Sequence, residues 1–163
     1  MPGSVGVWRV PTPDAHVRLR SNRIGLMDLE ASAPVRSGLL TVSADAARIE
    51  LVLALEQLRA SFLLERAARA LVSAHQVHDL AYDATGPGGK APWSVRGDAI
   101  AGNVVVDLTV EVTPRGPAHD EMAQVELRGF AALGAVELPL PGLGRIDDLR
   151  VTLDSVLALQ RYH

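Results

Sequence analysis

The sequence predicts a single antiparallel β-barrel of about eight strands, accompanied by one amphipathic helix. Two observations favour this fold class. Apolar and polar residues alternate with a period of two in three long segments, and clusters of Gly, Pro, Asp and Asn divide the chain into about ten short strand-like pieces. Such alternation gives a strand one apolar and one polar face, which is typical of an antiparallel sheet that is solvated on one side.

The three alternating segments are the clearest predicted strands. Their apolar residues of one parity are Ile49, Leu51, Leu53 and Leu55; Val104, Val106, Leu108, Val110 and Val112; and Leu149, Val151, Leu153, Leu157 and Leu159. Charged residues such as Glu50, Asp107 and Arg150 occupy the opposite parity. Because successive side chains of a strand point to opposite faces, each segment is predicted to bury one face and expose the other.

Shorter apolar segments are expected to supply the remaining strands. They are Val5–Val10, Ala15–Arg20, Ile24–Glu30, Gly38–Ser43, Val77–Ala84, Trp93–Asp98, Met122–Phe130 and Ala135–Leu138. Turn residues separate them at 11–14, 45, 86–89, 101–103, 114–117 and 139–144. About ten short strands at this spacing predict a sandwich or a barrel.

One segment has a different pattern. Gln57–Ser73 contains no Gly or Pro, and its apolar residues recur with helical spacing among charged ones. Glu65 and Arg69 are four residues apart, in the order that stabilises a helix. We therefore expect one amphipathic helix that covers the barrel or its mouth.

Composition narrows the protein class. The 163 residues fit one domain, and the absence of cysteine excludes disulfides and thiolate metal sites. No apolar run approaches the roughly 20 residues of a membrane span, so stable membrane insertion is not expected. A net charge of −3 argues against a nucleic-acid partner. The first ten residues do not show the basic and apolar regions of a signal peptide, so the expected location is the cytoplasm.

A series of short motifs along the chain is similar to a known family. The motifs are Trp8-Arg9-Val10, Ala15-His16-Val17, Gly38-Leu39-Leu40-Thr41-Val42, Glu65-Arg66, His78-Asp79-Leu80-Ala81-Tyr82, Trp93-Ser94-Val95-Arg96-Gly97-Asp98 with Gly102, and Asp148-Leu149-Arg150-Val151-Thr152-Leu153. In this order they resemble the YceI-like family, whose members resemble lipocalins and bind polyisoprenoids. The resemblance runs from about Val7 to Gln160 and implies a lipocalin-like barrel that binds an isoprenoid.

The chain departs from the family pattern in its predicted helix. Family members commonly have an Arg-Asp pair followed by His, whereas Ala67 and Ala68 follow Arg66 here. His78 stands where family members often have proline. Any contact that those residues make to a ligand head group is therefore not carried over to this chain.

No motif in the sequence predicts a metal, a cofactor or catalysis. His75 and His78 are three residues apart in a predicted loop and strand, where their side chains point to opposite faces. Gly86–Lys90 lacks the early Gly and the final Ser or Thr of a phosphate loop. No serine lies in a Gly-x-Ser-x-Gly turn, and consecutive acids such as Asp147 and Asp148 are usually solvated. We expect a binding protein rather than an enzyme.

The apolar face of the strands is the predicted functional site. An eight-stranded barrel either just fills its interior or holds one ligand, and only 4% of the residues are aromatic, which favours incomplete filling. Together with the resemblance, this predicts a lumen that holds a polyisoprenoid or another long apolar lipid. The predicted wall residues are Ile49, Leu51, Leu53, Leu80, Tyr82, Val106, Leu108, Val110, Phe130, Val151 and Leu153. Phe62 and Leu63 are expected to close the lumen from the helix, and Trp8 and Trp93 to lie at its rim.

Two other functions remain open from the sequence. The first is a filled barrel without ligand that serves as a structural or protein-interaction domain. The second is an enzyme for a lipid-like substrate, which would need a polar cluster in the lumen, such as His16 or His78 with Asp79. Edge strands and the loop Pro139–Gly144 would support a homodimer.

Overall fold

The computed structural model describes residues 5–11, 14–22, 30–60, 65, 77–102, 104–119, 121–137 and 145–162. Its elements, in chain order, are β1 (Gly6–Arg9), β2 (His16–Ser21), β3 (Glu30–Val42), β4 (Ala46–Ala54), the 3₁₀ turn η1 (Leu55–Gln57), β5 (Arg59–Ala60), β6 (Asp79–Pro87), β7 (Trp93–Ala101), β8 (Val104–Pro114), β9 (Met122–Glu137) and β10 (Arg145–Tyr162).

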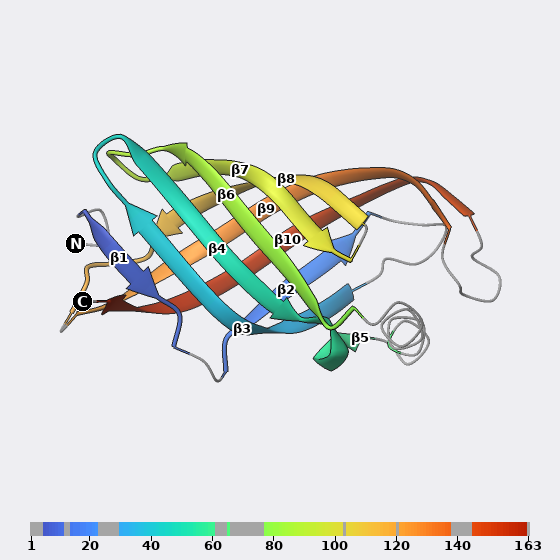
Figure 1. Cartoon of the computed structure of the whole chain (residues 1–163), viewed down its shortest axis with the longest axis horizontal. Helices are drawn as coiled ribbons and strands as arrows, with labels where there is room; N and C mark the ends of the chain where they lie inside the picture. Colours follow the sequence, from blue (N-terminus) through green and yellow to red (C-terminus); the bar gives the residue numbers. More distant parts are fainter. Residues whose placement is uncertain are drawn as a thin grey trace.

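The strands form one antiparallel sheet that closes on itself (Figure 1). Neighbouring strands follow the order β2, β3, β4, β6, β7, β8, β9 and β10, and β10 pairs with both β9 and β2. This eight-stranded closure confirms the predicted fold class. It also removes the free edges on which strand-to-strand aggregation depends.

Two short strands, β1 and β2, together occupy one strand position of the barrel. β1 and β2 both lie between β10 and β3, with β1 near one end of the barrel and β2 nearer the other. The break between them is bridged by two backbone hydrogen bonds to β3: the Val10 N–H donates to the Gly38 carbonyl, and the Val35 N–H donates to the Ala15 carbonyl. Pro11 lies at the start of the break and has no N–H with which to extend the ladder of β1.

Three strands are longer or shorter than the sequence pattern predicts. The predicted strand Gly38–Ser43 is only the second half of β3, which begins at Glu30 and contains a bulge between Val35 and Ser37. The predicted strand Ala135–Leu138 is the end of β9 rather than a separate strand. Leu55, which continues the alternation of β4, lies in η1 because the chain turns away from the sheet there.

The predicted helix can be compared with the structure only at its start. Gln57 ends η1, Leu58 is extended, and Arg59–Ala60 form β5, so the helix does not begin at Gln57 as predicted. β5 pairs with Ala31 and Ser32 of β3. Glu65 is helical, and the remainder of the predicted helix, including Phe62 and Leu63, lies outside the described residues.

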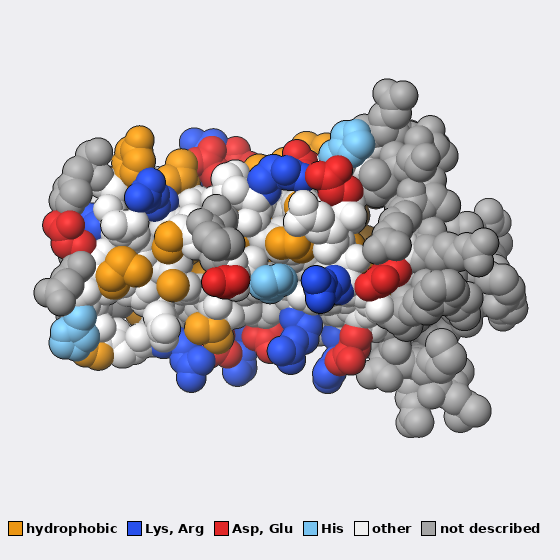
Figure 2. All heavy atoms as spheres, turned by 90° about the horizontal axis from the view of Figure 1, so that it is seen from below, with side chains coloured by type: hydrophobic (Ala, Val, Ile, Leu, Met, Phe, Trp, Pro, Cys, Tyr) orange, Lys and Arg blue, Asp and Glu red, His pale blue; other side chains and the backbone are white. Residues whose placement is uncertain are grey.

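Buried side chains from every barrel strand form one hydrophobic cluster inside the barrel. The outer face carries the polar residues of each strand, and Figure 2 shows acidic and basic side chains close together on one side of the molecule with hydrophobic ones scattered between them. Among the described residues, no helix is long and apolar enough to span a bilayer.

Candidate functional site

Ten of the predicted wall residues belong to the inward faces of the strands. Ile49, Leu51 and Leu53 of β4 are all buried, as their shared parity predicts. Val151 is half-buried at an inward position of β10, and the others, which are buried or packed against the core, are Leu80, Tyr82, Val106, Leu108, Val110 and Leu153. The structure therefore brings these residues together around the barrel interior.

The burial of these inward residues changes along the barrel. In β8, Val112, Val110 and Leu108 are 0%, 1% and 8% exposed, whereas Val106 is half-buried and Val104 is 58% exposed. The same change occurs in β2 and β10. Val17 is fully buried while Leu19 is half-buried, and Leu157 is 1% exposed while Val151 is half-buried. The exposure of several inward side chains thus increases toward one end of the barrel, although Leu53 and Leu149 at that end are only 3% and 6% exposed.

The end with the half-buried residues is lined by small or medium apolar side chains. Inward-facing alanines occur there in β3, β7 and β9, at Ala33, Ala99 and Ala131. They face half-buried aliphatic residues such as Leu80 and Val106. We call this part of the interior the open end. Its inward residues are Leu19, Ala31, Ala33, Leu53, Leu80, Ala99, Val106, Ala131 and Val151.

The two tryptophans close the opposite end. Trp8 and Trp93, which are predicted to lie at the rim, are 3% and 1% exposed and belong to the central cluster, so both are packed inside the barrel near this end. The indole Nε1 of Trp93 donates a hydrogen bond to the Gly89 carbonyl at 3.1 Å. The Arg161 guanidinium lies 5.6 Å from the centre of the Trp8 ring. Two large buried rings fill this end, and the Trp93 N–H has a partner, as expected for buried tryptophan.

Phe130 does not belong to the wall. It is 52% exposed and points out of the barrel, because the inward positions of β9 are the odd-numbered ones, such as Val125, Leu127 and Ala131. The sequence contains the signal that corrects this prediction, since Glu126 and Arg128 have the same parity as Phe130. Polar neighbours at even positions place Phe130 on the solvated face.

The polar side chains inside the barrel donate hydrogen bonds to backbone carbonyls. The Tyr82 hydroxyl donates to the Leu108 carbonyl at 2.8 Å, and the Ser155 hydroxyl donates to the His16 carbonyl at 2.6 Å. Burial, with a smaller effect from the charge of Asp107, raises the pKa of Tyr82 far above its usual value, so this residue is neutral. Within the described chain, no buried side-chain polar atom lacks a partner. The described interior can therefore recognise a ligand by shape and apolar contact.

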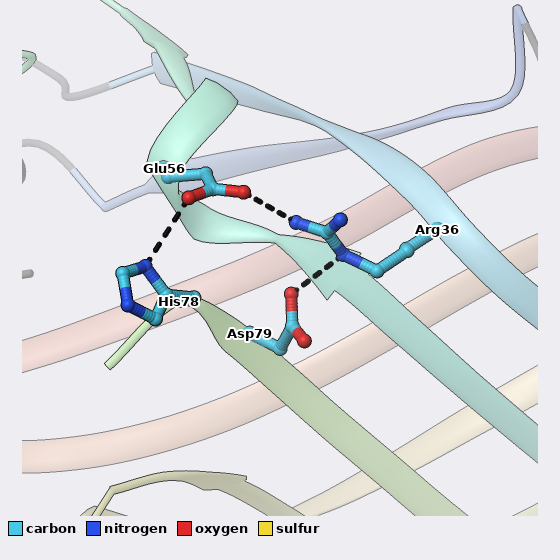
Figure 3. Close-up of polar contacts among 4 residues, drawn as sticks. All are labelled: Arg36, Glu56, His78 and Asp79. Carbon is cyan, nitrogen blue, oxygen red and sulfur yellow. Dashed lines mark hydrogen bonds and ion pairs between the residues drawn. The ribbon is translucent and has the colours of Figure 1, made fainter. Parts of the chain in front are cut away.

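A polar cluster lies on the outer face where β4 ends and β6 begins (Figure 3). The bulge in β3 directs Arg36 outward, where Nη2 donates to Glu56 at 2.6 Å and Nε donates to Asp79 at 2.7 Å. His78 Nδ1 lies 3.2 Å from the second oxygen of Glu56. Arg36 thereby joins η1 to the start of β6. Sequence analysis missed Arg36 and Glu56, since neither the bulge nor the pairing of distant residues is visible in a single sequence.

The cluster does not form the polar site that a lumen enzyme would need. All four side chains are substantially solvent-exposed, and His16 lies on the outer face of β2. A groove of about 1020 Å³ crosses the outside of β3 nearby and is lined by Asp14, His16, Arg36, Glu56 and others of both charges. Among the described residues, no group of three or more His, Asp or Glu side chains is arranged to hold a metal ion. His75 lies outside the described residues.

The cluster predicts a specific pH dependence. The hydrogen bond from Arg36 holds the pKa of Glu56 below its usual value of 4.5, against the opposing effect of partial burial. A lowered folded-state pKa contributes stability above the unfolded-state pKa, and this contribution disappears as the pH falls through the folded-state value. In Arg36→Gln we expect the urea midpoint to fall less than in the wild type between about pH 5 and about pH 3.

The matched control for this variant is Arg59→Gln. Arg59 is exposed on β5 and makes no ion pair with any described residue. Its replacement is expected to leave the wild-type pH dependence of the urea midpoint unchanged. An equal pH dependence in all three proteins would show that the Arg36–Glu56 contact does not persist in solution.

Comparison with known proteins finds a structural likeness but no match to a family model or to a curated protein. No protein-family model matches the chain, and no curated protein matches it. Among solved structures, a polyisoprenoid-binding domain from Saccharophagus degradans, implicated in plant cell wall breakdown, is similar, with 12% identity and a TM-score of 0.45. The match covers 98% of this chain and 100% of that domain. At this identity and TM-score, the likeness says nothing about what this chain binds.

Proposed function

We propose that this barrel binds a long apolar lipid, such as a polyisoprenoid, whose hydrocarbon chain enters the barrel interior at the open end. The observation that carries the proposal is the change in burial along the inward faces. Val110 and Leu157 are 1% exposed, whereas Val106 and Val151, at inward positions of the same strands, are only half-buried. Apolar surface of this kind is stabilised when a hydrocarbon covers it.

Hydrocarbon burial supplies sufficient free energy for binding. Each methylene removed from water contributes about 0.8 kcal/mol. A chain segment of about ten carbons would therefore contribute about 8 kcal/mol before the loss of its own freedom is subtracted. Because no buried side-chain polar atom among the described residues lacks a partner, we infer that the ligand is selected by chain width and length. The ordered motifs that resemble the YceI-like family support the same proposal.

The proposal is tested by narrowing the open end. Val106 and Val105 are adjacent in β8 but face opposite sides of the sheet, since Val106 packs against the core and Val105 is 57% exposed. In Val106→Trp the indole would occupy the open end, so we expect the affinity for dansyl-farnesol, measured by fluorescence titration, to fall at least about tenfold. Val105→Trp adds the same group outside the barrel and is expected to bind like the wild type.

A second measurement addresses the natural ligand. Protein purified from cells is denatured and extracted with organic solvent, and the extract is analysed by mass spectrometry for isoprenoid or fatty chains. Absence of any such molecule, together with no saturable binding of dansyl-farnesol, would contradict the proposal. That result would favour a filled barrel that serves as a structural or protein-interaction domain.

A further inference from the structure

Four carboxylates form a row across the outside of the barrel. Glu50 of β4 is directly opposite Asp83 of β6, Asp83 is opposite Asp98 of β7, and Asp98 is opposite Asp107 of β8. Three like-charge pairs thus follow one another on four adjacent strands, which Figure 1 shows side by side on one wall of the barrel. Like charges directly opposite in a sheet are destabilising.

Arginines compensate this row only in part. Arg48 is 2.7 Å from Asp83 and 3.2 Å from Glu50, and Arg96 forms an ion pair with Asp107 at 2.5 Å. The guanidinium groups hold the pKa values of Asp83 and Asp107 below the usual range, so both are charged at neutral pH. Asp98, in the middle of the row, makes no hydrogen bond or ion pair with any residue in the described part of the chain.

Another acidic residue shows that this arrangement is not general on the outer face. Asp154 of β10 lies directly opposite Arg18 of β2 on one side and Arg128 of β9 on the other. Asp98 has aspartates in both of these positions. The negative charge at Asp98 is therefore one that the fold does not need and that a cation from outside would stabilise.

An apolar row runs beside the acidic one. Val52, Ala81, Ile100 and Val105 lie opposite one another on β4, β6, β7 and β8, two residues along each strand from the carboxylates. Ile100 is 43% and Val105 57% exposed. A groove of about 690 Å³ is lined by members of both rows, including Val52, Ile100 and Asp98, and also by Arg9 and Arg36. The surface thus presents an apolar stripe with a negative border.

We propose that these two rows dock a basic amphipathic helix of a partner protein, which lies across the strands. Adjacent strands are about 4.8 Å apart, and one helical turn rises about 5.4 Å. Because these four strands make up half of a closed eight-stranded barrel, the row curves, and a straight helix with one Lys or Arg per turn reaches Asp98 and the carboxylates next to it. Its neighbouring apolar stripe then covers Ile100 and Val105. In an extended peptide, side chains on the same face are about 6.6 Å apart. This spacing would no longer match the distance between adjacent barrel strands after two strands.

The test uses a synthetic amphipathic peptide as the probe. It carries Lys once per turn beside a Leu stripe, and its counterpart has Glu in place of each Lys. We expect the Lys peptide to bind the wild-type protein in a salt-sensitive manner and to become more helical in circular dichroism. Asp98→Lys and Ile100→Ser are each expected to weaken this binding at least about tenfold.

Residues of β10 provide matched control variants. Asp154 and Val156 are also an exposed acid and an exposed aliphatic residue two positions apart on one strand. Asp154→Lys and Val156→Ser are expected to change peptide binding less than about twofold. Thermal unfolding checks the charge environment independently: Asp98→Lys should raise the midpoint because it removes two like-charge pairs, and Asp154→Lys should lower it because it creates two.

Three outcomes would overturn the docking proposal. The first is no saturable binding of the Lys peptide at low salt, and the second is equal binding by the Asp98 and Asp154 variants. The third is self-association of the wild-type chain in sedimentation that Asp98→Lys abolishes, since a second copy would then occupy the surface. Because the surface lies outside the barrel, dansyl-farnesol binding is independent of all three outcomes.

Discussion

Replacing Trp93 with alanine is expected to lower the free energy of unfolding by about 3–5 kcal/mol, as for other buried tryptophans. The side chain is 1% exposed at the closed end of the barrel, opposite Val112, and its indole N–H is bonded to the Gly89 carbonyl. Truncation removes a large apolar contact, leaves a cavity and leaves this carbonyl without its partner. Urea unfolding, monitored by far-ultraviolet circular dichroism, measures the loss.

Phe130→Ala is the matched control, because it also truncates an aromatic residue in a barrel strand. Phe130 is 52% exposed on the outer face, so its truncation is expected to lower the free energy of unfolding by about 1 kcal/mol or less. Comparable losses in the two variants would contradict the assignment of Trp93 to the interior and Phe130 to the exterior. Where Trp93→Ala remains folded, dansyl-farnesol binding should persist, since Trp93 lies at the closed end.

Gly97→Ala is expected to destabilise the barrel by about 3 kcal/mol or more, at or beyond the upper end of ordinary overpacking effects. A Cβ atom at Gly97 would lie 1.9 Å from the Asp83 carbonyl oxygen and 2.7 Å from the Ala84 Cα. Both atoms belong to the backbone of β6, which pairs with β7 here, so the clash can be relieved only if the two strands move apart. The urea midpoint, again followed by circular dichroism, measures this effect.

Gly6→Ala serves as the control for the same substitution in another strand. The atoms nearest to a Cβ at Gly6 belong to the Arg161 guanidinium, at 3.3 and 3.4 Å, and this flexible side chain can move. The free energy of unfolding is therefore expected to change by about 0.5 kcal/mol or less. Similar losses for both glycines would show that β6 and β7 are not in close contact at Gly97.

The alternation of β8 and β10 made their inward faces predictable. Leu108 and Val110 of β8 and Leu153 of β10 are buried, as the sequence predicts. The polar residues of the opposite parity, such as Asp107 and Arg150, are exposed. This part of the fold could be predicted because the two-residue period depends only on the local direction of side chains in an extended chain.

Phe130 and Arg36 show two different limits of such prediction. Phe130 is apolar, but the polar residues Glu126 and Arg128 share its parity, so the pattern of the strand determines its direction and not its own hydrophobicity. The direction of Arg36 depends on a bulge at which β3 has one residue more than β4. A bulge is a property of two paired strands, so the sequence of one strand does not reveal it.

The inward direction of most predicted wall residues could be predicted, but the geometry of the interior could not. Leu80, Leu108 and Val151 were predicted to face one interior, and they do. Which end of that interior is accessible was not predictable. It depends on where the two tryptophans lie relative to the alanines of other strands, and therefore on the register between strands.

The choice of a barrel over a sandwich came from the family resemblance, whereas the residue pattern by itself determined an antiparallel β fold, which face of most strands is apolar, and where several of its turns occur. These properties follow from side-chain period and turn chemistry, which act over a few residues. Only the tertiary structure decided which residues meet across strands, as in the carboxylate row from Glu50 to Asp107 and the contacts of Arg36 with Glu56 and Asp79. Strand register and bulges arise from backbone pairing between segments that are distant in the sequence, and local patterns do not specify that pairing.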